Sequence, residues 1–415
     1  MTPTTITAQE FDELSAHHPL GNFQQTSQMR TLAAHRVESS DIVGVRNDAG
    51  QLIAAALIEY TRGRFGLEGS IWLGPLCDLH DGDEVKALTD AIRHAAAARG
   101  AISVTCWPNA LYRRHASDGT AEGEPDDAAI AAMAGSGWIH AGFDTGYGAV
   151  CNRWNYVKDL TGIADEKALL NSYDKRTQWS VKRARSMGVH VRELEPAEFA
   201  IFADIERRTA ERRSFAARDE QYFHDFKDAF GDKARFMLAE IHIAEYAAEM
   251  TAKRDALAAK VASLQAKYDE HPTTKTQRQL GEETRNLEAA IKRLDEARSF
   301  AEQGDVLPAA ASLFVEGPQE MVYLYSGSLS EYKPFYASAL IQHWAMSRAL
   351  EIGVERYNFY GISGVFDDPQ DEGRGVLEFK QGFNGYVEEL VGEFTLPVNR
   401  LRFSISEAAH KLLKR

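Results

Sequence analysis

One lysine near the carboxyl end of the chain has surroundings typical of a substrate site. Lys380 stands between Phe379 and Phe383 in the run FKQGF, after an acidic loop that glycines punctuate from Gly361 to Gly375. Aromatic rings attract a nearby ammonium group, and glycines let a ligand approach the backbone closely. The alternative is a lysine at a strand edge whose aliphatic stem lies along the rings, which is the commoner situation for such a residue.

The sequence offers no motif for a metal centre or a protein nucleophile. HExxH and GxSxG are absent, and no pair of cysteine and histidine stands out by its spacing. Cys77, Cys106 and Cys151 are widely spaced and odd in number, which argues against a disulfide framework and against a zinc knuckle. We therefore expect chemistry without a metal or a resident cofactor.

The charge balance restricts the partners of the chain. Its 61 acidic and 47 basic residues give a net charge of -14, so the protein as a whole should repel nucleic acid and anionic membranes. Any contact with RNA must therefore be local. Two local groups of basic residues could make such a contact. They are Lys175, Arg176, Lys182, Arg183 and Arg185 in one stretch, and Arg207, Arg208, Arg212, Arg213 and Arg218 in the other.

Nothing in the sequence predicts a membrane span or a leader. The first fifteen residues lack a basic start and an apolar core, and the longest aliphatic run, Leu52 to Ile58, is too short to cross a bilayer. We expect a cytoplasmic protein.

Helical and strand patterns alternate along the chain, which predicts two mixed α/β domains. We place the first at 1–150 and the second at 151–399, and we expect a C-terminal helix over 400–415 to pack back on the first domain. The expected elements include helices over 85–99, 166–187, 196–213, 220–230 and 336–352, and strands over 42–46, 52–60, 101–106, 152–160, 189–194, 234–244, 310–315 and 321–325.

A different pattern fills residues 246–302. Met250, Leu257 and Leu264 recur every seven residues, and a second series with the same spacing follows a proline-bearing loop. That second series is Leu280, Leu287 and Leu294, with Ile291 between. Two helices with narrow apolar seams predict an antiparallel coiled-coil arm inserted in the second domain. Its basic and acidic residues are nearly equal in number, so a role in dimerisation or as a spacer is at least as well supported as RNA binding.

The end of the chain resembles a known family. The order YNFYGISG, a variable acidic loop, FK-x-GF and VGEF-x-x-P-x-N is similar to the signature of the FemABX family of non-ribosomal peptidyltransferases. The similarity runs from Phe23 to the C-terminal helix and is most specific in the last hundred residues. It implies an α/β fold of two tandem acetyltransferase-like (GNAT) domains, which some members combine with a coiled-coil arm.

The resemblance also implies an activity. Members of the family transfer an amino acid from aminoacyl-tRNA to a peptidoglycan precursor, building the bridge between peptide strands. The attacking group is the side-chain amine of the third stem-peptide residue, and the acceptor is lipid II or a UDP-linked muropeptide. Lipid II is favoured for members with an arm, which would bring the protein into transient contact with the inner membrane face. The resemblance leaves open whether the protein forms a homodimer.

The same matching carries functional residues over to this chain. Lys380, preceded by Phe379, corresponds to the lysine most closely tied to transfer and would stabilise the developing oxyanion. Arg218 and Tyr222 in RDEQY correspond to a pair that holds the pyrophosphate of the carrier, and Tyr325 to a third position of that site. Weaker expectations concern one carrier contact and the tRNA phosphates. They are Arg30, with Arg36 as the other nearby cation, for the carrier, and Lys175, Arg176, Lys182, Arg183 and Arg212 for the tRNA.

The chain departs from the family at one informative position. Where members commonly have an acid before the proline of a strand-end motif, this sequence has Trp107 before Pro108. The substrate amine then arrives neutral, helped by water or by a neighbour such as Asp78, or the acid is dispensable.

Two other classes compete with this interpretation. The GNAT fold usually serves acyl-CoA, but the glycine-rich pyrophosphate loop that opens a helix in such enzymes is not evident. A scaffold that assembles through its coiled coil would not need Lys380, Arg218 or Tyr222, all of which are present.

Overall fold

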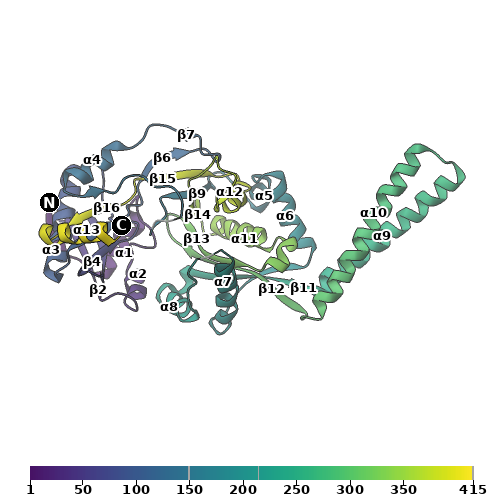
Figure 1. Cartoon of the computed structure of the whole chain (residues 1–415), viewed down its shortest axis with the longest axis horizontal. Helices are drawn as coiled ribbons and strands as arrows, with labels where there is room; N and C mark the ends of the chain where they lie inside the picture. The colour runs from purple at the N-terminus through teal and green to yellow at the C-terminus, as the bar shows by residue number, and fades with distance from the viewer. Residues whose placement is uncertain (148–149, 214, 414–415) are drawn as a thin grey trace.

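The structure is a computed structural model that describes residues 1–147, 150–213 and 215–413. An α/β body carries a long helical arm that projects away from it at one side (Figure 1). Two sheets form the body, each with helices packed on it, which agrees with the predicted α/β class.

The first sheet has seven strands in the order β1-β2-β3-β4-β5-β16-β8. They are β1 (Thr2–Thr5), β2 (Ser39–Arg46), β3 (Leu52–Arg62), β4 (Leu67–Ile71), β5 (Ser103–Cys106), β8 (Ile139–His140) and β16 (Phe394–Pro397). Helix α3 (Gly82–Arg99) packs on β2 and β3 and buries Leu88 and Ile92 in their core. It begins at a side-chain cap from Asp81 and ends at Gly100, whose left-handed φ of 78° stops the helix.

The second sheet has nine strands in the order β10-β11-β12-β13-β14-β9-β15-β6-β7. They are β6 (Leu111–His115), β7 (Ala121–Glu122), β9 (Trp154–Asp159), β10 (Val189–Glu193), β11 (Ala234–His242), β12 (Val306–Glu316), β13 (Met321–Ser328), β14 (Arg356–Ile362) and β15 (Tyr386–Leu390). Only β13 and β14 pair in parallel within it, among the described strands. Helix α11 (Ala337–Glu351) packs on β11 and β12.

Sheet membership does not follow sequence order. Strands β6 and β7 precede residue 150 but join the second sheet, and β16 follows the whole second unit but joins the first. The limits 1–150 and 151–399 remain our proposal for the two domains, except that β6 and β7 belong to the sheet of the second domain and β16 to that of the first. Helix α13 (Arg400–Leu413) lies beside α3 (Figure 1), and its Phe403 lines a surface pocket with Arg93 of α3. Residues 414 and 415 of the expected terminal helix lie outside the described part of the chain.

The single helix predicted over 166–187 is wrong, because the chain forms two. Helix α5 (Glu166–Asn171) ends at Ser172, and α6 (Lys175–Ser186) starts after Asp174, whose side chain accepts from Thr177 N at 2.6 Å. An aspartate cap of this kind satisfies the free N–H groups of a new first turn, so it interrupts a pattern that otherwise continues. The helix predicted over 196–213 corresponds to a short turn and α7 (Phe199–Arg213), and that over 220–230 to α8 (Glu220–Phe230).

The predicted arm is present as helices α9 (Ile243–Glu270) and α10 (Thr274–Ala301), which run side by side between β11 and β12. Twenty-eight residues in each helix correspond to a length of about 42 Å. Leu257, Leu264 and Leu287 lie half-buried between the two helices, whereas Leu294 is buried near the body. Ile291, expected in the seam, is 43% exposed instead.

None of the helices in the described ranges is long and apolar enough to cross a membrane.

Candidate active site

Lys380 lies in a helix and is buried, so the alternative of a surface lysine at a strand edge is wrong. It belongs to α12 (Arg374–Gln381), and only 4% of its surface is exposed. Its Nζ donates to the carbonyl oxygens of Tyr360 at 3.2 Å and Gly361 at 2.6 Å. The ammonium group is therefore held against the end of β14, the strand that opens the signature.

Burial also changes the proton affinity of this lysine. Desolvation disfavours the charged form and lowers the pKa of Lys380 to about 7. The ring of Phe379 in α12 and that of Phe383, in the turn just after the helix, lie edge to face at 5.4 Å. A lysine that changes charge near neutral pH is unusual and is characteristic of functional sites.

The end of β14 has an uncommon backbone that aims the two carbonyls. Tyr360 has a φ of 64°, a left-handed value that is rare for an aromatic residue. The Asn358 side chain accepts from Tyr360 N at 2.8 Å, and pairing with β9 shifts register between Asn358 and Gly361. Strain of this kind persists only where surrounding contacts enforce it, and it gathers at active sites.

Gly361→Ala tests whether this backbone matters. A Cβ at this position would lie 2.2 Å from the side chain of Asn152, so either that side chain or the strand end that carries the two carbonyls must shift. We expect transfer to fall by about 100-fold, the usual effect of displacing a reacting group by an ångström. Gly375→Ala is the matched control, because a Cβ there meets nothing within 4 Å, and it should leave the rate unchanged. Equal rates for both variants in a transfer assay would contradict the role of the β14 end.

A second group gathers two arginines around a tyrosine. Tyr222 of α8 is buried, and its hydroxyl lies 3.2 Å from that of Tyr325 on β13. The guanidinium groups of Arg218 and Arg36 each lie 5.0 Å from the centre of the Tyr222 ring. Among the described residues, no carboxylate lies within ion-pair distance of either guanidinium. Neither arginine forms an ion pair within the described ranges, although Glu206 lies close enough to Arg218, and Glu59 close enough to Arg36, for the charges to interact. Two guanidinium groups beside phenol hydroxyls are chemically suited to a doubly charged anion such as pyrophosphate.

Arg30 is not part of this group. Its Nε donates to Ser40 Oγ at 3.2 Å at the surface, whereas Arg36, six residues later, reaches Tyr222. The sequence places both arginines near one predicted contact, and only the fold distinguishes them. Glu206 was not predicted at all; it is buried and accepts from Arg218 N at 3.0 Å, and burial raises its pKa to about 7.

Tyr360 connects the lysine to the arginine group. Its carbonyl binds Lys380, and its phenol has a pKa well above the ordinary value because of burial and the nearby Cys151 and Tyr325. Cys151 in turn has a pKa raised to about 12 by burial and by the neighbouring carboxylate of Glu393. Tyr360 thus interacts electrostatically with Tyr325 and with Cys151, which in turn interacts with Glu393.

Trp107 stands where family members commonly have an acid, and its side chain binds a carboxylate from elsewhere in the chain. Its Nε1 donates to Glu393 Oε2 at 3.0 Å, and its ring stacks on Trp72 at 4.7 Å. Glu393 lies in the VGEF part of the signature, far away in sequence, so only strand pairing of β16 with β5 brings it here. Asp78, the alternative neighbour considered, is 62% exposed and lies next to His80 instead.

Four of the five residues predicted to meet tRNA lie on α6. Lys175, Arg176 and Lys182 are exposed, beside the exposed ring of Trp179. Burial and the nearby Arg293 of the arm lower the pKa of Arg183, so α6 and the arm base share a positive surface. The fifth residue, Arg212, lies apart on α7 and donates to Ser328 O at 3.0 Å and Ser330 Oγ at 2.8 Å.

Comparison with known proteins agrees with these features. The FemAB family matches residues 6–411. Aminoacyltransferase FemA of Staphylococcus aureus strain N315 is 27% identical over 421 residues, which cover 99% of each chain, and FemA of strain NCTC 8325 is equally similar. The crystal structure of FemX has the same fold, with a TM-score of 0.77 at 22% identity over 98% of this chain and 99% of that one. The resemblance in the signature is thus confirmed, and the chain belongs to the FemAB family of transferases.

Proposed function

We propose that the protein transfers an amino acid from aminoacyl-tRNA to the side-chain amine of the third stem-peptide residue of a peptidoglycan precursor. Membership of the FemAB family and the similarity to the aminoacyltransferase FemA support this proposal. Two observations carry it: Lys380 is buried with its Nζ held by two backbone carbonyls at the end of the signature strand, and two guanidinium groups flank the Tyr222 ring.

The reaction needs little covalent help from the protein. The substrate amine attacks the ester carbonyl of the aminoacyl-tRNA, the new amide forms, and the ester bond to the terminal ribose breaks. The amine proton passes to the leaving hydroxyl. The ammonium of Lys380 stabilises the oxyanion that develops on the carbonyl, in a dry environment that strengthens this interaction. To Glu393, which Trp107 holds by a hydrogen bond, we assign the role of orienting the attacking amine.

The carrier is held by its phosphates. Two guanidinium groups, from Arg218 and Arg36, flank the ring of Tyr222, and Tyr325 adds a hydroxyl group. A pyrophosphate is common to lipid II and a UDP-linked muropeptide, so the arginine group alone does not separate them. We favour lipid II because the arm suits a precursor that is met at the inner membrane face. Competition between the two carriers for one site would test this preference.

The tRNA is met by the positive surface of α6 and the arm base. Lys175, Arg176 and Lys182 supply phosphate contacts, and Arg183 lies close enough to Arg293 for the two like charges to interact. Arg212, already bound to the protein, contributes less. The outer part of the arm is left for dimerisation or for spacing.

The pH dependence should reveal Lys380 directly. If the ammonium form is the active one, the rate of the wild type relative to Lys380→Arg falls as pH rises through about 7, where the buried lysine loses its proton and the arginine does not. Ionisation of the substrate amine affects both proteins alike, so it cancels in this ratio. The measurement is single-turnover transfer against pH for both proteins. A ratio that stays constant through this range would exclude the proposed role of the ammonium group.

The activity itself is tested with purified protein, lipid II and a pool of charged tRNAs. Mass spectrometry of the muropeptide should show an increase of one amino-acid residue, which also names the residue. Acylation from acyl-CoA, with no transfer from any charged tRNA, would instead make the protein an acyl-CoA-dependent N-acyltransferase.

A further inference from the structure

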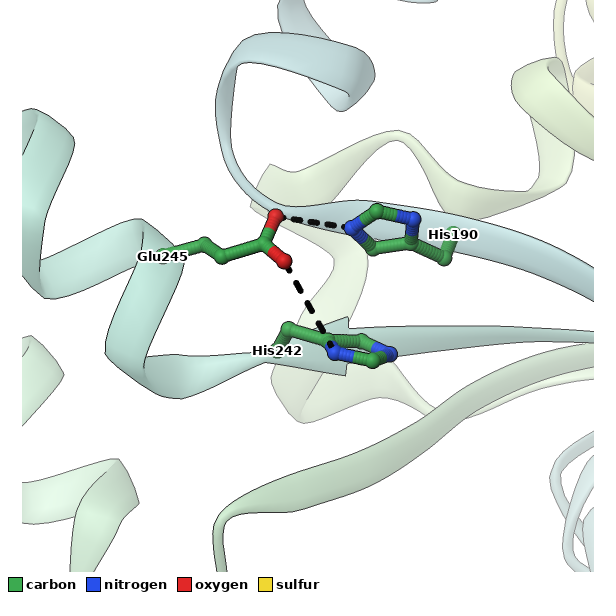
Figure 2. Close-up of side chains that lie close together, drawn as sticks. All are labelled: His190, His242 and Glu245. Atoms are coloured by element: carbon green, nitrogen blue, oxygen red, sulfur yellow. Dashed lines mark hydrogen bonds and ion pairs between the residues drawn. The ribbon is translucent and has the colours of Figure 1, made fainter.

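Two histidines and a glutamate meet at the root of the arm, far from the signature lysine in sequence. His190 lies on the edge strand β10, His242 ends β11, and Glu245 lies in the first turn of α9 (Figure 2). The pairing of His190 with Glu240 places His190 and His242 on the same face of the sheet, one diagonal step apart. Their rings approach to 4.3 Å between centres.

The ligand atoms of these residues are spaced as a small metal ion requires. His190 Nε2 lies 2.7 Å from Glu245 Oε2, and His242 Nδ1 lies 3.9 Å from Glu245 Oε1. One ligand atom from each residue lies within 4.8 Å of the others. Ligands about 2.0–2.1 Å from a tetrahedral zinc ion are about 3.3 Å from each other, so small side-chain rotations close the set.

A second layer of contacts already orients one ligand. His242 Nε2 lies 3.1 Å from Glu240 Oε1, which leaves Nδ1 facing Glu245. Glu240 Oε2 accepts from Arg192 Nε at 2.9 Å, and Arg192 in turn donates to both carboxylate oxygens of Glu198. A metal-binding histidine almost always gives its other ring nitrogen to a carboxylate in this way, because the contact fixes the tautomer and the ring direction.

We propose that His190, His242 and Glu245 bind a divalent transition-metal ion, with zinc the best fit, and that the ion fastens the arm to the edge of the second sheet. Two imidazoles and one carboxylate are ligands that zinc accepts, and a water completes four-coordination. The site stands apart from the proposed transfer chemistry. It is structural, since its ligands come from two strands and from the helix that begins the arm.

The packing at this junction explains why an ion would act there as a fastener. His242 N donates to Gly188 O at 2.8 Å, and a Cβ on Gly188 would meet His242 O at 2.8 Å and Glu245 Cβ at 3.1 Å. The first turn of α9 therefore lies tightly against the turn before β10. An ion bridging Glu245 to both histidines would resist any swing of α9 away from that strand.

The test uses untagged, chelator-treated, full-length protein, because a polyhistidine tag would itself bind zinc. Zinc titration by calorimetry should show one site, and the double variant H190A/H242A should bind at least 100-fold more weakly. His224→Ala is the control, since His224 is a partly exposed histidine beside Glu220 and lies outside the cluster. Cobalt added in place of zinc should give the visible absorption of a tetrahedral site in the wild type and in the control.

Three results would overturn parts of the proposal. No binding by the wild type, or equal binding by H190A/H242A, would exclude the site. Binding through this site without slower hydrogen exchange over residues 243–250 would exclude the fastening role. Glu245→Gln guards against a folding artefact, because it leaves both strands intact and should weaken zinc binding while the circular dichroism spectrum stays unchanged.

Discussion

Lys380→Met should abolish most transfer and at the same time make the protein more resistant to heat. We expect the rate to fall by about 100- to 1,000-fold, because a preorganised positive group at a developing oxyanion contributes on the order of 3–4 kcal/mol. Binding of the carrier should change little, since the lysine touches backbone carbonyls rather than the arginine group. Wild-type turnover in this variant would remove Lys380 from the mechanism.

The stability part follows from the lowered pKa. Between pH 7 and pH 10 the folded lysine is largely neutral and the unfolded lysine is protonated, so the unfolded state binds more protons and stability rises with pH there. Below about pH 7 the full cost of burying the charge remains, on the order of a few kcal/mol before the two carbonyl contacts offset part of it. Methionine removes that cost, so the gain in melting temperature should be larger at pH 6 than at pH 9.

Lys158→Met is the matched control for this experiment. Lys158 of β9 is also buried, and burial also lowers its pKa, to about 8. Among the described residues, the only hydrogen bond of its side chain is a long one, 3.4 Å from Nζ to Asn384 O. It should gain stability in the same direction and keep transfer within a few-fold of the wild type. Equal loss of transfer in both variants would mean that Lys380 acts through the fold.

Arg218→Ala should weaken binding of the carrier by about 1.5–3 kcal/mol, which is roughly 10- to 150-fold in Kd, the usual contribution of a charge-assisted contact to phosphate. The substitution keeps the backbone N–H of residue 218, which donates a hydrogen bond to Glu206. The loop before α8 therefore keeps this contact. Calorimetry with a UDP-linked muropeptide measures the change, and the transfer rate at saturating carrier should change much less.

Variants of three further arginines test whether the loss of affinity is specific to the carrier site. Arg36→Ala should resemble Arg218→Ala, because both guanidinium groups flank the Tyr222 ring. Arg30→Ala should bind the carrier normally, as should Arg207→Ala, whose guanidinium is exposed and paired with Asp204 and Glu211. Unchanged affinity in both Arg218→Ala and Arg36→Ala would move the carrier site elsewhere.

The sequence predicted local features well. The heptad spacing of the leucines gave the arm with its correct insertion point, and Gly100 marked the end of α3. Both signals are short-range, because a cap or an apolar seam is defined within a few turns. The break at Asp174 was missed because a helix pattern with good apolar spacing hides a cap inside it.

The sequence could not predict which distant residues meet. Arg36 and Arg30 are equally basic and six residues apart, yet only Arg36 reaches Tyr222. The carboxylate beside Trp107 comes from Glu393, because β16 crosses back to the first sheet. His190 and Glu245 are 55 residues apart and lie together only because β10 pairs with β11 at the base of α9. The first of these contacts depends on the packing of α2 (Ser27–Ala33) against α8 and the other two on strand order, and local patterns encode neither.

The chain enters the arm at the end of β11 and leaves it at the start of β12, where His242 pairs with Val306. The base of the arm is packed into the body, since Tyr246 contacts Phe335 and Met250 is buried. The free part of each helix, about twenty residues, is therefore a lever about 30 Å long with its pivot at this base. A rotation of about 10° at the pivot displaces the tip by about 5 Å, close to the pitch of one helical turn. Removing equal numbers of turns from both helices would shorten the lever without altering the pivot, which makes its reach an adjustable property of the chain.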